Sequence, residues 1–84
     1  MNRLPLTPGR MALSMAGRDQ GRRFIVIAEV DSDFVLIADG GLRGIDRPKK
    51  KRRKHLKPLP GVMSLPEDRL PMNHEIRRAL CEDL

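Results

Sequence analysis

Residues 23–39 read Arg-Phe-Ile-Val-Ile-Ala-Glu-Val-Asp-Ser-Asp-Phe-Val-Leu-Ile-Ala-Asp, and this stretch decides the fold. Two runs rich in β-branched residues, 23–30 and 34–39, flank the Asp-Ser-Asp of residues 31–33. β-Branched residues favour strands, and short Asp and Ser side chains bond their own backbone in turns. The stretch therefore predicts an antiparallel hairpin. Both strands are apolar at almost every position, which in a small chain fits a tightly curled barrel whose strands are covered on both sides.

The residues before this hairpin predict a further strand and a turn. Met11, Leu13 and Met15 alternate with smaller residues, the period-two pattern of a short strand. The sequence Gly-Arg-Asp-Gln-Gly follows at residues 17–21 and has two glycines available for positive φ. We therefore expect an antiparallel arrangement that begins near residue 9, after a loose lead-in over residues 1–8 that contains two prolines.

The C-terminal third predicts a connector and a short helix. Prolines recur through residues 58–72, so this segment is expected to be neither helix nor central strand. In the tail, 73–84, Asn73 is expected to cap a helix with Glu75 in its first turn. The stripe formed by Ile76, Ala79 and Leu80 either docks on a partner or folds back onto the open end of the barrel, and so small a core favours the second.

Composition excludes several classes of protein. The chain has 84 residues, of which 39% are hydrophobic, with no Trp, no Tyr and only two Phe, both of which we assign to the core. So few residues scarcely build a core and a deep catalytic pocket together. A single cysteine, Cys81, permits no internal disulfide and favours a reducing compartment. No apolar run approaches the ~20 residues that span a bilayer. We expect a soluble, cytoplasmic protein without a membrane partner.

The positive charge is concentrated in one segment. The net charge is +6, yet residues 1–46 sum to zero and residues 58–84 to −2. Residues 47–57 carry eight Lys or Arg and no acid. Folding gives no reason to collect charges that repel one another, whereas a polyanion does, because each neutralised phosphate releases counterions. The alternative is a solvated, disordered charged loop.

The order of these features resembles a known family. A strand, the turn Gly17–Arg22 and the apolar strand that follows resemble the KOW motif of ribosomal and transcription-elongation proteins. The continuation through Arg47-Pro48-Lys49-Lys50-Lys51 to Lys54-His55-Leu56 is similar to a narrower group. These are small bacterial KOW-domain RNA-binding proteins, themselves similar to KOW-containing large-subunit ribosomal proteins.

The resemblance implies a mainly β protein, a five-stranded SH3-like antiparallel barrel over residues 9–57 with a short C-terminal helix. It also implies non-catalytic binding of structured RNA, with ribosomal RNA and the ribosome as expected partners. Because both Phe residues are assigned to the core, we expect contact through phosphates and shape rather than base stacking. The expected RNA-binding residues are Arg18, Arg22, Arg23, Arg43, Arg47, Lys49, Lys50, Lys51, Arg52, Arg53, Lys54, His55 and Lys57.

Two other functions compete with RNA binding. Residues 48–54 are also typical of a nuclear-import signal, which would fit a protein-protein interaction module and needs only an exposed flexible run. An enzyme has little support, since His55, His74 and Cys81 are the only His or Cys residues and form no recognisable zinc or catalytic pattern. The residue pattern therefore predicts no metal, no cofactor and no small-molecule substrate.

Overall fold

The computed structural model describes residues 4–82. The first three residues of the expected lead-in and the last two of the expected tail lie outside them. Five strands, one 3₁₀ turn and one α-helix follow in order: β1 (Arg10–Ser14), β2 (Arg23–Glu29), β3 (Phe34–Ala38), β4 (Lys49–Arg52), η1 (Arg53–His55), β5 (Leu56–Val62) and α1 (Asn73–Glu82). The expectation of a mainly β protein with a C-terminal helix is confirmed.

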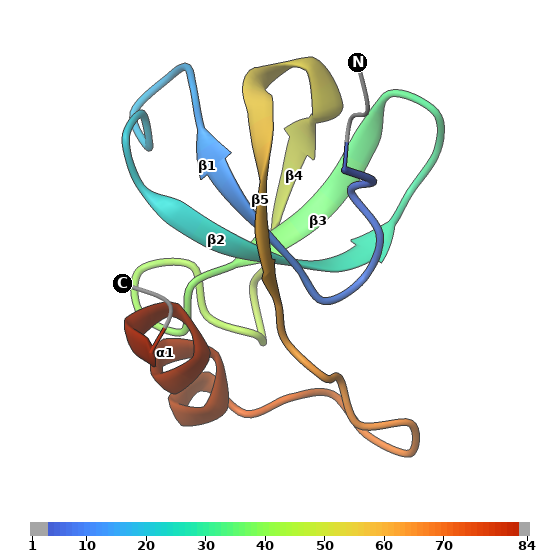
Figure 1. The fold of residues 1–84 in the computed structure, drawn as a ribbon, viewed down its shortest axis with the longest axis vertical. Coiled ribbons are helices and arrows are strands. Elements are labelled where there is room, and N and C mark those ends of the chain that lie inside the picture. Colours follow the sequence, from blue (N-terminus) through green and yellow to red (C-terminus); the bar gives the residue numbers. More distant parts are fainter. Residues whose placement is uncertain (1–3, 83–84) are drawn as a thin grey trace.

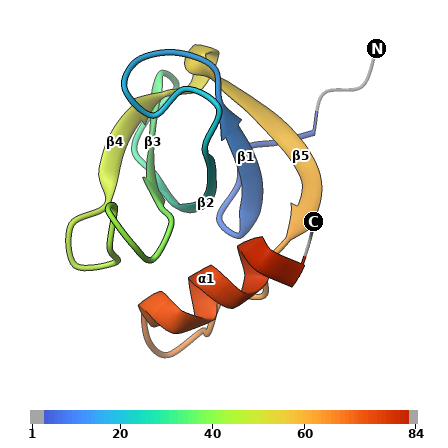
Figure 2. The same ribbon diagram turned by 90° about the vertical axis from the view of Figure 1, so that its left-hand side faces the viewer.

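The strands form a single curled antiparallel sheet in the order β4-β3-β2-β1-β5 (Figure 1). The two edge strands, β4 and β5, are consecutive in the chain and are joined by η1 alone (Figure 2). Within residues 4–82 no ladder pairs β4 with β5, so the sheet is curled without a closing row of strand hydrogen bonds.

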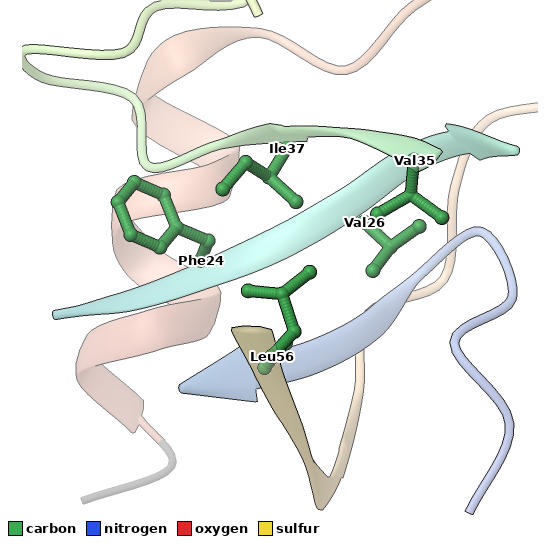
Figure 3. Close-up of a cluster of buried hydrophobic side chains, with 6 residues drawn as sticks. Phe24, Val26, Val35, Ile37 and Leu56 are labelled. Atoms are coloured by element: carbon green, nitrogen blue, oxygen red, sulfur yellow. The ribbon is translucent and has the colours of Figure 1, made fainter. Parts of the chain in front are cut away.

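Both faces of the central strands are covered, as their continuous apolar sequence predicts. The inner cluster joins Phe24, Val26, Val35, Ile37 and Leu56 with Ala12 inside the curl of the sheet (Figure 3). On the other face, Ile25 and Ile27 of β2 pack with Met11, Ala38 and Ile76. Ile76 belongs to α1 and is fully buried, so the helix stripe folds back onto the sheet. The chain thus covers one face of β2 by curling the sheet and the other by docking its helix.

Residues 58–62, expected to belong to the connector and to be neither helix nor central strand, continue β5 at the edge of the sheet. An edge strand tolerates proline because one side of its backbone needs no ladder donor. Pro58 pairs with Ala12, and Pro60 lies where the β1–β5 register shifts. The Arg10 guanidinium donates to the carbonyls of Leu59 and Pro60, each at 3.2 Å, so the shifted stretch has side-chain partners instead of ladder bonds.

The turn chemistry agrees with the sequence. Gly17 and Gly21 have φ of +80° and +86°, the left-handed conformation that glycine adopts without strain. The Asp31 carboxylate accepts hydrogen bonds from the backbone N–H of Asp33 and Phe34, both at 2.8 Å. These bonds lower the pKa of Asp31.

The helix begins differently from the prediction. Asn73 is its first residue, and the Asn73 side chain accepts the Ile45 N–H at 2.7 Å instead of capping α1. Glu75 caps the helix by accepting the Met72 N–H at 2.8 Å, one half of a capping box. The Asn73 side chain therefore ties the helix start to the β3–β4 loop.

Candidate nucleic-acid interface

The basic segment, residues 47–57, is folded into β4, η1 and the start of β5. Successive side chains of a strand point to opposite faces, so the run of cations divides into two sets. Lys49 and Lys51 point inward toward the β1–β2 turn, and Lys50 and Arg52 remain exposed. The division separates cations used within the fold from cations that face solvent.

The inward set is organised by Asp19, a buried residue of the β1–β2 turn. Its carboxylate accepts hydrogen bonds from Lys49 Nζ at 2.8 Å and from the Arg43 guanidinium at 3.3 Å. The bond from Lys49 is the main cause that lowers the pKa of Asp19, against the opposing effect of burial. Asp19 therefore stays ionised and clamps the turn onto β4 and the β3–β4 loop.

Lys51 is the most enclosed cation of the segment, at 7% exposure. Its ammonium donates to the Ala16 carbonyl at 2.8 Å. Burial lowers the pKa of Lys51, and neighbouring Lys49 lowers it further. Sequence reasoning placed Lys51 against RNA with its neighbours, but in the fold its amino group is already engaged inside the protein.

Arg53, the residue directly after β4, contacts the end of β2 and the β2–β3 turn. Its guanidinium pairs with Glu29 at 2.9 Å and donates to the Asp31 carbonyl at 3.0 Å. The adjacent His55 is half-buried, and its carbonyl accepts the Met15 N–H. These contacts fix the 3₁₀ turn that leads from β4 to β5.

Five cations of the segment are exposed and form the set called here the exposed basic strip: Arg47, Lys50, Arg52, Lys54 and Lys57. Among residues 4–82, none of the five makes an ion pair with a carboxylate. Unpaired exposed cations on adjoining elements are suited to phosphate contact, since they need not break an internal pair to bind.

The three arginines predicted to bind RNA at the β1–β2 turn also differ in exposure and in ion pairing. Arg18 is exposed, and Arg23 is half-buried at the start of β2. Arg22 is exposed but pairs with Asp39 at 2.9 Å. The turn thus lies beside the inward cations, and of its three arginines Arg18 is exposed without an ion pair to any described residue.

Phe34 lies outside the core, contrary to the prediction, whereas Phe24 is fully buried as expected. As the first residue of β3, Phe34 pairs with Arg52 on the outer face, while Val35 turns inward. Lys50 Nζ lies 4.6 Å and Arg52 Cζ 4.9 Å from the centroid of the Phe34 ring. Phe34 is therefore an aromatic neighbour of the exposed basic strip. The sequence analysis assigned it to the core, although strand alternation from the inward Val35 would have indicated an outward Phe34.

Neither a metal-ligand group nor a membrane-spanning helix is found in the described residues 4–82. No group of three or more His, Cys, Asp or Glu side chains is placed to hold a metal ion there. No helix in that range is both long and apolar enough to cross a membrane.

Comparison with known proteins then identifies the family. No family model matches the chain. It is 32% identical over 75 residues to large ribosomal subunit protein eL14 of Staphylothermus marinus, across 87% of this chain and 74% of that protein. It is 33% identical over 76 residues to the eL14 of Desulfurococcus amylolyticus, across 89% and 76%. The expected similarity to large-subunit ribosomal proteins is confirmed, and a ribosomal protein family agrees with the prediction of no catalytic activity. The chain belongs to the family of large ribosomal subunit protein eL14.

Proposed function

We propose that this chain is an RNA-binding protein of the KOW type that contacts structured ribosomal RNA through its exposed basic strip. The proposal includes a cytoplasmic ribosome as its location and the large subunit as its site of assembly. One observation carries it: five exposed cations in eleven residues have no acidic partner among residues 4–82.

The fold proposed for this function is an SH3-like barrel of the small bacterial KOW group. Leu56 of edge strand β5 packs in one cluster with Val35 and Ile37 of β3, the strand next to the opposite edge, so the curled sheet encloses a common interior. The barrel then includes residues up to 62, the connector runs from 63 to 72, and the helix forms the tail. The inward cations and Asp19 stabilise the turn beside the strip, so they contribute to shape rather than to direct contact.

The division of the basic segment also bears on the import-signal alternative. An import receptor reads an exposed flexible run, but residues 49–52 form a strand and Lys51 is buried. The helix stripe that an interaction module would offer to a partner is centred on Ile76, which the sheet already buries. Both observations favour RNA binding over the alternative.

A salt titration tests the proposal. If all five strip residues contact phosphates, log K should fall with log salt with a slope of about −3.5 or steeper, taking the single-strand coefficient of roughly −0.7 for each contact as the lower guide. Affinity for a structured RNA would then fall about 2 logs between about 50 and about 200 mM salt. The double variant Lys54→Gln/Lys57→Gln should reduce the slope by about 1.4.

The charge-matched control is Arg69→Gln/Arg78→Gln, which removes the same formal charge from the connector and the helix; because Arg69 pairs with the helix-capping Glu75 at 2.8 Å, thermal unfolding of this variant is recorded as well. Its slope should equal that of the wild-type chain. Equal slopes for the two double variants, or no RNA binding by the wild-type chain at low salt, would refute the assignment of phosphate contact to the strip.

A further inference from the structure

Phe34 is the aromatic residue that the fold leaves at the surface. The chain has two Phe and no Trp or Tyr, and Phe24 is fully buried in the inner cluster. Phe34 is half-buried at an outward position of β3, beside edge strand β4. The ring is therefore part of the surface, and the side chains that lie over it determine what a partner contacts there.

Two cationic side chains lie over the Phe34 ring, so the site combines an aromatic face with positive charge. Lys50 and Arg52 both place their charged ends over the ring, at 4.6 and 4.9 Å from its centroid. Such contacts are attractive because the ring face is electron-rich. A planar guanidinium over a ring is a surface on which a nucleobase stacks, and each nearby cation also reaches a phosphate.

A cleft of about 340 Å³ lies next to the Phe34 and Arg52 side chains, and Arg52 is one of its lining residues. Lys54 lies along it, Leu56 and Pro58 supply apolar lining, and Ser32 and Asp33 of the β2–β3 turn supply polar groups. The cleft therefore combines an apolar surface, hydrogen-bonding side chains and cations. That combination fits a flat heterocycle that carries a phosphate.

We propose that Phe34 and Arg52 form a stacking site for one unpaired nucleobase of the bound RNA, with Lys50 and Lys54 at the adjoining phosphates. This inference rests on the proposed function and refines it, because phosphate contact alone gives no preference for unpaired nucleotides. The preferred ligand is then a hairpin or bulge with an unstacked base, rather than a continuous duplex.

Fluorescence gives a direct test, because the natural chain contains no Trp. Phe34→Trp introduces one reporter at the site and keeps an aromatic face. A hairpin RNA with one unpaired loop-out nucleotide should quench the Trp emission, and a fully paired hairpin of equal length should quench it much less. Equal quenching by both RNAs, or by neither at saturation, would overturn the stacking site.

Affinity measurements provide the second test. Phe34→Leu should weaken binding to the looped-out hairpin about tenfold, within the range for loss of one stacked base, and leave its salt slope unchanged. Binding of the fully paired hairpin should not change, and Phe34→Trp should retain the wild-type preference. The matched control is Leu42→Ala, a change of an apolar side chain that is 78% exposed in the β3–β4 loop.

The outcomes separate the two proposals. If the wild-type chain binds RNA with the expected salt slope but Phe34→Leu affects both hairpins equally or neither, the stacking site is refuted and phosphate contact stands. If the wild-type chain binds neither hairpin at low salt, both proposals are refuted.

Discussion

The substitution Asp19→Asn tests how the inward cations are held. Asp19 is the carboxylate on which Lys49 and Arg43 converge, and its side chain is 6% exposed. The variant keeps a hydrogen-bond acceptor of similar size but removes the charge. Two cations would then lie beside a neutral amide, with the buried Lys51 ammonium close by.

The expected loss lies between two known limits. Removing one partner of a fully buried pair costs about 3–5 kcal/mol, and exposed pairs contribute about 0–1 kcal/mol. Here the carboxylate is buried, but the side chains of Lys49 and Arg43 are 29% and 35% exposed, so solvent screens part of the interaction. We expect the free energy of unfolding to fall by about 2 kcal/mol, equivalent to roughly 10 °C in Tm for a domain of this size.

Urea unfolding at pH 7 and at acidic pH measures this loss. The folded-state pKa of Asp19 lies below its ordinary value of 3.8, so its stabilisation is fully present above pH 3.8. It is lost as the pH falls through the lowered pKa, because the folded state must then release the ion pairs. The difference between wild type and variant should shrink in that acidic range. Asp68→Asn, an exposed acid in the connector, is the control and should change little.

A loss below about 0.5 kcal/mol at pH 7, the ordinary effect of a surface substitution, would refute the clamp. A difference that stays constant as the pH falls well below 3.8 would also refute it, since the carboxylate charge would then not be the cause.

Four further substitutions test the fold, three inside it and one at its surface. Gly40→Ala should cost about 2 kcal/mol or more by urea unfolding, because φ is +79° and the new Cβ would clash with the Asn73 carbonyl oxygen. Ile76→Ala should cost about 3 kcal/mol in the same assay by opening a cavity beneath the helix, and a loss under 1 kcal/mol would contradict its burial. Gly21→Val should cost about 1 kcal/mol or more because its φ of +86° is strained for Val, whereas Arg52→Ala should stay within about 0.5 kcal/mol in thermal unfolding.

The central hairpin was predictable because its sequence leaves few alternatives. The β-branched runs of residues 23–30 and 34–39 and the Asp-rich turn between them agree with the structure in strand type and turn chemistry. Their continuous apolar character also predicted cover on both faces. The apolar stripe around Ile76 predicted that the helix folds back onto the barrel at its open end, and in the structure Ile76 packs on the face of the sheet opposite the inner cluster.

The features that were missed depend on tertiary partners. Pro58 and Pro60 indicated a connector, because a local rule cannot show that β5 would lie at an edge with Arg10 bonding to its shifted stretch. Asn73 had the right residue type for a cap, but a loop N–H competes for its side chain. In each case a distant group, the Arg10 side chain or the Ile45 N–H, determined the outcome.

The candidate site shows the same limit. Eight cations in residues 47–57 predicted a polyanion partner, and strand alternation explains why they separate into two sets. Which set points inward depends on the register of Lys51 with Val35 and on the position of Asp19, far away in sequence. Phe34 was assigned to the core by residue type, yet its place at the start of an edge-paired strand leaves it half-exposed.

The most direct test of the central claim is an NMR titration of the labelled full chain with a structured RNA hairpin. The account predicts that the side-chain signals of Lys50, Arg52 and Lys54 shift on binding, while the Lys51 ammonium keeps its bond to the Ala16 carbonyl and shifts little. Shifts confined to α1, or shifts of Lys51 as large as those of Lys50, would contradict the claim that the exposed basic strip is the RNA-binding surface.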